Sequence, residues 1–397
     1  MVEQNSAEFA FENDGTGTQK STARIRIQSE AGLQRFAVLT FPYQSATESV
    51  EVGYIRVRKP DATIVTTPPD TAQDIASEIT RQAPLYSDLR EKHIAVKGLS
   101  VGDVLEYEVQ ERIAKPMAPG QFWCSYAFPT DGIILQENVQ VSVPRERAVK
   151  WRSPKVKPVI TESGSRRVFT WTYCLLEPKS KDQEKQNQQT AIYQASRSKL
   201  PQADILFSSF QSWEELGRWY NTLQEERAKP TPEIRTKAAE LTKGLTDDHA
   251  KAVAIYGYVS TGIHYIGIDL GIGRYQPHSA GDVLNNQYGD FKDKHTLLAA
   301  LMEAAGMRAW PALIGSSHDL DPSVPTPAQF DHVVSAVQID NHLTWLDTTP
   351  EVAPFAYLFS GLRGKNALLV PISRPRSRLP RLIRWCSLRT HSWLTPS

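Results

Sequence analysis

Three cysteines and nine histidines are the side chains whose chemistry would matter most. Nucleophilic thiol catalysis needs a cysteine of lowered pKa, typically at a helix N-terminus, with a histidine within hydrogen-bonding reach and a carboxylate or amide that orients the histidine. Cys124 and Cys174 lie where the pattern predicts strands, and Cys386 lies in a basic C-terminal segment. They are also too few and too scattered for a disulfide framework.

Metal binding is a second chemistry that these side chains could support. The candidate ligands are His264, His278, His295, His318, Asp331 and His332. No pair of histidines has the i, i+4 helical spacing, with a glutamate between, that is typical of a zinc motif. Gly271-Ile-Gly273 lacks the strand, loop and helix context of a phosphate loop. The sequence therefore predicts no metal and no other cofactor.

The length of 397 residues favours two domains. No apolar run approaches the roughly 20 residues that span a bilayer, so no transmembrane segment is expected. The first residues lack a basic stretch followed by an apolar one, which predicts no signal peptide and, as written, a cytoplasmic protein. A net charge of +1 gives no case for nucleic-acid binding.

The front of the chain has the period of strands. Apolar residues alternate with polar ones at Val50/Val52/Tyr54, Val139/Val141/Val143 and Phe169/Trp171/Tyr173. Turn signals separate these runs, and the one candidate helix extends from Asp70 to Gln82. The pattern predicts an antiparallel β-sandwich, and we assign it residues 1–200.

The back of the chain has the period of helices followed by strands. The polar run 177–189 has nothing to bury and predicts a linker. Ser212-Trp-Glu-Glu215 is a capping box, and Thr231-Pro232 is a second helix start. A helix is expected over 290–305, followed by strands at 309–314, 332–339 and 343–347. This α+β domain is assigned residues 205–372.

The last segment, residues 373–397, holds six arginines and no acid, which leaves the rest of the chain mildly acidic. Its interspersed prolines and lack of periodicity predict a disordered basic tail. The abrupt change of composition after Ile372 is also what a shift of reading frame would produce.

Three motifs of the back half resemble one family. Tyr288-Gly-Asp-Phe-Lys-Asp-Lys294 is similar to the Tyr-Gly-Asp-Cys-Lys-Asp signature of bacterial transglutaminase-like proteins, which have a papain-like fold. Phe330-Asp-His-Val333 resembles their histidine strand, and Trp345-Leu-Asp-Thr-Thr349 their aspartate strand. The front half resembles the β-rich domain of unknown function that commonly precedes this module, especially around Gly102-Asp-Val-Leu-Glu-Tyr-Glu108.

The resemblance implies a degenerate Cys-His-Asp triad. It gives His332 the position of the general base and Asp347 that of the residue that orients it, while Phe291 occupies the position of the nucleophile. A phenyl ring can form no acyl intermediate. Gly271-Ile-Gly273 would lie on the approach to the site. Asp290 and Asp293 are interpreted as an N-cap and a first-turn charge that complements the helix dipole, in preference to catalytic residues.

His332 and Asp347 also have simpler readings, as an ordinary strand histidine and a turn residue. Our first hypothesis is nevertheless a pseudoenzyme that binds a peptide or other protein segment, without cleaving or cross-linking it, in a cleft framed by residues 271–295, His332 and Asp347. Two alternatives stay open. The first is an active thiol acyltransferase or peptidase, if Phe291 is a sequence error, because Cys and Phe codons can differ by one base. The second is a scaffold module of the cell envelope, since relatives are often exported.

Overall fold

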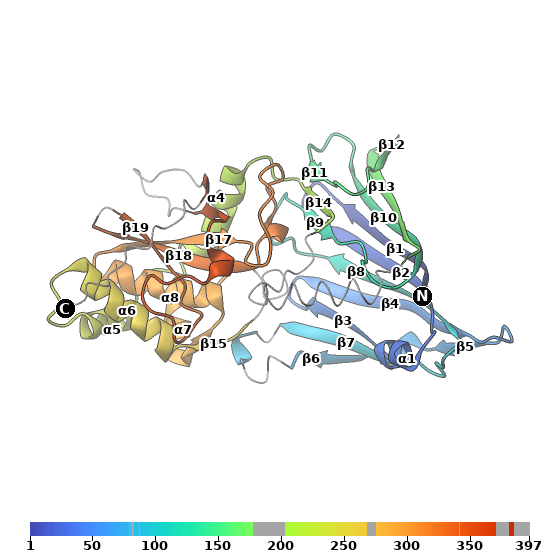
Figure 1. Ribbon diagram of the computed structural model, residues 1–397, viewed down its shortest axis with the longest axis horizontal. Helices are drawn as coiled ribbons and strands as arrows, with labels where there is room; N and C mark the ends of the chain where they lie inside the picture. The colour runs from blue at the N-terminus through green and yellow to red at the C-terminus, as the bar shows by residue number, and fades with distance from the viewer. Residues whose placement is uncertain are drawn as a thin grey trace. The chain divides into compact units, whose positions relative to one another are not determined.

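Figure 1 shows the computed structural model of the chain. It describes residues 1–78, 80, 83–86, 88–177, 203–267, 275–340 and 342–370, and the backbone of residues 381–384. These residues form two compact units, of which the first ends at Gln211 and the second begins at Ser212. Each unit is built around its own sheets and its own apolar core.

An eight-stranded sheet forms the body of the first unit, with strand order β12-β13-β10-β1-β2-β8-β4-β5. Neighbouring strands are antiparallel, except that β1 and β10 are parallel. The strands, in chain order, are β1 (Val2–Phe11), β2 (Gly17–Arg26), β4 (Glu48–Arg58), β5 (Ile64–Thr67), β8 (Val104–Ile113), β10 (Ile134–Pro144), β12 (Val159–Ser163) and β13 (Arg166–Leu175).

Two three-stranded sheets pack against this large sheet. One has the order β3-β7-β6 and the other β11-β14-β9. Apolar side chains of the large sheet, among them Phe9, Val141 and Trp171, pack against Phe122 and Phe207 near and within the second small sheet. This arrangement confirms the predicted β-sandwich. The additional elements are α1 (Glu30–Phe36), β3 (Val38–Gln44), β6 (Gln73–Ala76), β7 (Leu89–Ala95), β9 (Trp123–Tyr126), β11 (Lys150–Arg152) and β14 (Ile205–Ser208).

Two details of the first unit differ from the prediction. The helix expected from Asp70 is replaced by a short 3-10 turn, Pro69–Thr71, and by β6, because the backbone of Gln73–Ala76 pairs with β7. The first unit also extends to Gln211, beyond the predicted start of the second domain at residue 205. The reason is that β14 is an apolar strand paired with β9 and β11 of the first unit.

The second unit combines helices with a five-stranded antiparallel sheet of order β19-β18-β17-β20-β21, as predicted for its fold class. A short parallel pair joins β15 to β16. The elements are α4 (Trp213–Gln224), α5 (Pro232–Leu241), α6 (Asp248–Gly262), β15 (His264–Tyr265), α7 (Ala280–Asn286), β16 (Tyr288–Gly289), α8 (Phe291–Ala304), β17 (Arg308–Ile314), β18 (His332–Ile339), β19 (His342–Leu346), β20 (Asn366–Leu369) and β21 (Arg381–Arg384).

Helix α8 is the centre of the second unit. Its residues are buried from Phe291 to Met302, with Leu297 and Leu301 in the same apolar core as residues of α5, α6, α7, β18 and β19. Burial on every side is typical of a helix that other elements surround. Because so little of α8 can move without disturbing this core, the position of its first turn is closely fixed.

The basic C-terminal segment contributes one strand. Residues 381–384 form β21, which pairs antiparallel with β20, so the prediction of disorder does not hold for these four residues. The remainder of the segment, including Cys386, lies outside the described residues, as does Gly271-Ile-Gly273. Among the described residues, none of the helices is long and apolar enough to cross a membrane.

Candidate active site

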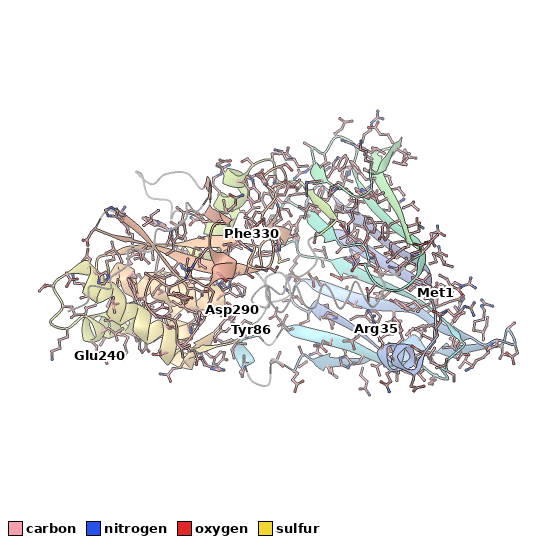
Figure 2. The ribbon with its side chains drawn as sticks, viewed as in Figure 1. Met1, Arg35, Tyr86, Glu240, Asp290 and Phe330 are labelled. Atoms are coloured by element: carbon pink, nitrogen blue, oxygen red, sulfur yellow. The ribbon has the colours of Figure 1, made fainter. Side chains whose placement is uncertain are left out.

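Helix α8 begins with a reciprocal cap. The Asp290 carboxylate accepts the backbone N–H groups of Lys292 and Asp293 at 3.0 and 3.1 Å, and the Asp293 carboxylate accepts the N–H of Asp290 at 3.4 Å. The predicted N-cap role of Asp290 is therefore present in the structure, and Asp293, predicted as a first-turn charge, also takes part in the cap. Figure 2 labels Asp290, where α8 begins, and Phe330, which lies just before β18. The cap places Phe291 at the first helical position.

The two strands nearest to this helix start carry the other two predicted residues. His332 is the first residue of β18, and Asp347 directly follows β19, the neighbouring strand. His332 Nε2 lies 3.1 Å from an Asp347 carboxylate oxygen. The other oxygen of Asp347 accepts the backbone N–H and the hydroxyl of Thr349, at 3.0 and 2.8 Å. These bonds fix the carboxylate, and the carboxylate in turn orients the imidazole.

Phe291 contacts the imidazole directly. The centroids of the Phe291 and His332 rings are 5.1 Å apart and the ring planes meet at 72°, an edge-to-face contact. Phe291 is 3% exposed, His332 8% and Asp347 3%. The structure thus brings together all three residues that the sequence singled out. Because Nε2 of His332 is engaged by Asp347, Nδ1 is the nitrogen that could exchange a proton with a nucleophile.

The His332–Asp347 pair is electrostatically coupled. Burial opposes the charged form of each group, but the Asp347 carboxylate raises the pKa of His332, with smaller contributions from Asp331 and Asp290. Burial likewise opposes ionisation of Asp347, but His332 and Thr349 hold its pKa below the usual value. The pair is therefore stabilised as imidazolium and carboxylate.

More charge is buried around the first turn of α8 than a cap requires. The Lys292 ammonium, 1% exposed, forms an ion pair with the fully buried Asp290 and lies 5.7 Å from the centroid of the Phe291 ring. Burial and the neighbouring Asp293 raise the pKa of Asp290, and Lys292 opposes that rise. Sequence reasoning assigned no role to Lys292. The sequence signal that could have pointed to this lysine is the Gly-Asp-x-Lys-Asp pattern of residues 289–293.

Two of the remaining candidate residues pair with one another: His318 Nδ1 lies 3.9 Å from an Asp331 carboxylate oxygen. His295 bonds Ser335 at 2.7 Å, and burial lowers its pKa to about 3, which keeps it neutral. His264 lies beside Glu351, and His318 beside Ser317. Among the described residues, no group of three or more histidine, cysteine, aspartate or glutamate side chains is arranged to hold a metal ion.

Neither described cysteine belongs to the second unit. Cys124 lies in β9 and is buried, which raises the pKa of its thiol, and Cys174 is an exposed residue of β13. A buried, uncharged thiol such as that of Cys124 is inert.

Comparison with known proteins agrees with this geometry. A family model of the transglutaminase-like superfamily matches residues 235–345, and a model of a domain of unknown function, DUF3857, matches residues 13–180. No curated protein matches the sequence. The first match includes Phe291 and His332 and ends just before Asp347.

The solved structures that match this chain include two described as proteases. A "putative protease" from Parabacteroides distasonis is 17% identical to this chain, with a TM-score of 0.76. The match covers 97% of this chain and 71% of the protease chain. A "putative cysteine protease" from Cytophaga hutchinsonii is 11% identical, over 85% of this chain and 77% of its own, but its TM-score of 0.23 is too low to carry an argument. The first likeness shows a shared fold and, at this identity, no more than the fold. The chain therefore carries a DUF3857 domain over residues 13–180, followed by a transglutaminase-like domain over residues 235–345.

Proposed function

We propose that this chain is a catalytically inactive transglutaminase-like protein whose site binds a protein or peptide segment without reacting with it. One observation carries the proposal. Phe291, which the resemblance puts at the position of the nucleophile, begins α8 and contacts His332, and His332 is hydrogen-bonded to Asp347.

The inactivity follows from the chemistry of thiol catalysis. In that route the histidine takes the thiol proton, the thiolate attacks an acyl carbon, and a thioester forms as an amine departs. Phe291 has no proton to give and no lone pair to attack with. Losing the nucleophile removes the covalent step itself, so the residual effect of a well-placed base cannot replace it.

The choice of a peptide as ligand rests on the protease description of the Parabacteroides distasonis structure and on the oriented His332–Asp347 pair. Because Phe291 and His332 are almost entirely buried, the segment would lie over the phenyl ring and would not reach the base.

A second candidate is an active thiol acyltransferase or peptidase with cysteine at position 291. The observation that favours it is the completeness of the surrounding site: the helix cap, the Lys292–Asp290 ion pair and the His332–Asp347 bond are all present. A single base distinguishes the two codons, so sequencing the source DNA decides between the candidates. A confirmed phenylalanine codon removes this one.

Catalytic inactivity is tested by acyl transfer from an activated ester. Full-length protein, the Phe291→Cys variant and the Phe291→Cys/His332→Ala variant are incubated with p-nitrophenyl acetate, and intact mass is recorded. We expect a covalent acetyl adduct on the thiol at position 291 in both cysteine variants, formed more slowly without His332. An acetyl adduct on wild-type protein that requires His332 would contradict the proposal.

Peptide binding needs a separate test. Fluorescence anisotropy of labelled unstructured peptides is measured with wild-type protein and with Phe291→Ala, using His264→Ala, an exposed site elsewhere in the second unit, as the control. We expect Phe291→Ala alone to weaken binding, by about tenfold for the loss of one buried aromatic contact. Equal affinities for all three proteins would show that the segment does not lie over this ring.

A further inference from the structure

A second histidine–carboxylate pair adjoins the start of α8. The backbone N–H of His278 donates to one oxygen of Asp293 at 2.7 Å, and His278 Nδ1 lies 3.0 Å from the other. Since a carboxylate only accepts hydrogen bonds, Nδ1 carries the proton. One residue thus engages both oxygens of a single carboxylate, which fixes the rotation of the Asp293 side chain.

Asp293 has little freedom of its own. It is fully buried at the third position of α8, and its carboxylate also accepts the N–H of Asp290. A Cβ atom placed on Gly289 would approach the Asp293 Cβ to 2.6 Å, so the chain before the cap packs directly on this side chain. Any displacement of Asp293 would therefore move the cap that positions Phe291.

Other helices of the second unit start without such an arrangement. α4, α5 and α7 are capped by the hydroxyl groups of Ser212, Thr231 and Ser279, and α6 by Asp247. At α8 two aspartates are completely buried, and Lys292, His278 and, from α4, Tyr220 lie close to their charges. Burying these charges is costly, so capping alone does not account for them.

We propose that His278 is a positioning residue: through Asp293 it holds the first turn of α8 so that residue 291 faces His332. The inference rests on the proposed function, because it assigns His278 to the same site. His278 precedes α7 by two residues, so the pair joins the segment before α7 to the start of α8. Two histidine–carboxylate pairs then serve one position. His332–Asp347 supplies the base, and His278–Asp293 places the residue opposite it.

The test uses the thiol introduced by Phe291→Cys in the full chain as a reporter of position. Its alkylation by iodoacetamide is followed from pH 5 to 9, because only the thiolate reacts. His278→Asn and His278→Gln are added separately. The asparagine amide can reproduce the donor at Nδ1, whereas the glutamine amide lies nearer to the place of Nε2. His264→Asn, at a histidine side chain that is 71% exposed, is the control.

We expect His278→Gln to raise the apparent pKa of the reporter thiol and to slow its alkylation at pH 6 by about fivefold or more, and His278→Asn to restore most of the rate. The control should leave the profile unchanged. Identical profiles for Phe291→Cys with and without His278→Gln would overturn the inference. If the Phe291→Cys thiol shows no activation that depends on His332, the proposed retention of the site fails instead, which is a distinguishable result.

Discussion

The two units differ in how deeply one class of side chain, the ion-paired charges, can lie. In the first unit, ion pairs such as Lys20–Glu108 and Arg24–Glu3 link neighbouring strands, and each includes a side chain at least 39% exposed. In the second unit, Lys292 and Asp290 pair with 1% and 0% exposure. Exposed pairs contribute little and cost little, whereas buried charges are expensive to desolvate. The comparison indicates that the charges around α8 are kept for the geometry of the site.

The largest contrast should come from removing one lysine in each unit. Lys292→Met leaves the buried Asp290 carboxylate without its counter-ion, and we expect the second unit to lose about 3–5 kcal/mol of unfolding free energy. Lys20→Met should cost the first unit about 0–1 kcal/mol. Hydrogen exchange with increasing urea, read at α8 and at β2, measures each unit separately. Similar losses in the two units would remove the distinction.

The His332–Asp347 pair gives a smaller effect with a characteristic dependence on pH. The folded-state pKa of His332 is raised, so its share of the stability is complete below about pH 6.5 and is lost as pH rises through the folded value. The folded-state pKa of Asp347 is lowered, so its share is complete above about pH 4 and is lost as pH falls through the folded value.

Asp347→Asn tests this window. We expect it to cost about 2 kcal/mol between about pH 4 and pH 6.5, and less on the alkaline side, because a hydrogen bond between charged groups is lost. Urea unfolding of wild type and variant from pH 4 to 9 provides the measurement. A cost that stays constant over this range would mean that the pair is not charged in the folded protein.

Glu111 in β8, a partly buried carboxylate of the first unit, gives the smallest effect. Burial, with the charge of Glu48, raises its pKa to about 7. The folded protein therefore disfavours its ionised form, a penalty that is absent below about pH 4.5 and grows until pH 7. Glu111→Gln should stabilise the first unit by about 1–2 kcal/mol at pH 8, allowing for partial exposure, and hardly at all at pH 4.5. Equal changes in unfolding free energy at pH 8 and at pH 4.5 would contradict this account.

Local patterns were sufficient to predict much of the fold. Period-two alternation located β4, β10 and β13, and capping residues located α4 and α5, because these signals depend on residues within one turn or one strand. The sequence also singled out Phe291, His332 and Asp347. It did so through a family resemblance that places one of them at the start of a helix and the other two on neighbouring strands. Their contact in the structure agrees with that interpretation.

Features that join distant segments could not be predicted in the same way. The parallel pairing of β1 with β10 brings Val2 opposite Ile134, and nothing local indicates it. The strand at Gln73–Ala76 forms because β7 is available to pair with it. His278 and Asp293 are 15 residues apart in the chain, and each has an ordinary local reading. Such contacts depend on tertiary packing, which overrides local preference.

The most direct test of the central claim is the reactivity of a thiol placed at position 291. The rate of iodoacetamide alkylation is measured against pH for Phe291→Cys and for Phe291→Cys/His332→Ala, with Cys124, Cys174 and Cys386 as internal references. If only the nucleophile has been lost, the introduced thiol will alkylate far faster than the references below pH 7 and will lose that advantage without His332. A thiol that behaves like an ordinary buried cysteine, with or without His332, would contradict the account.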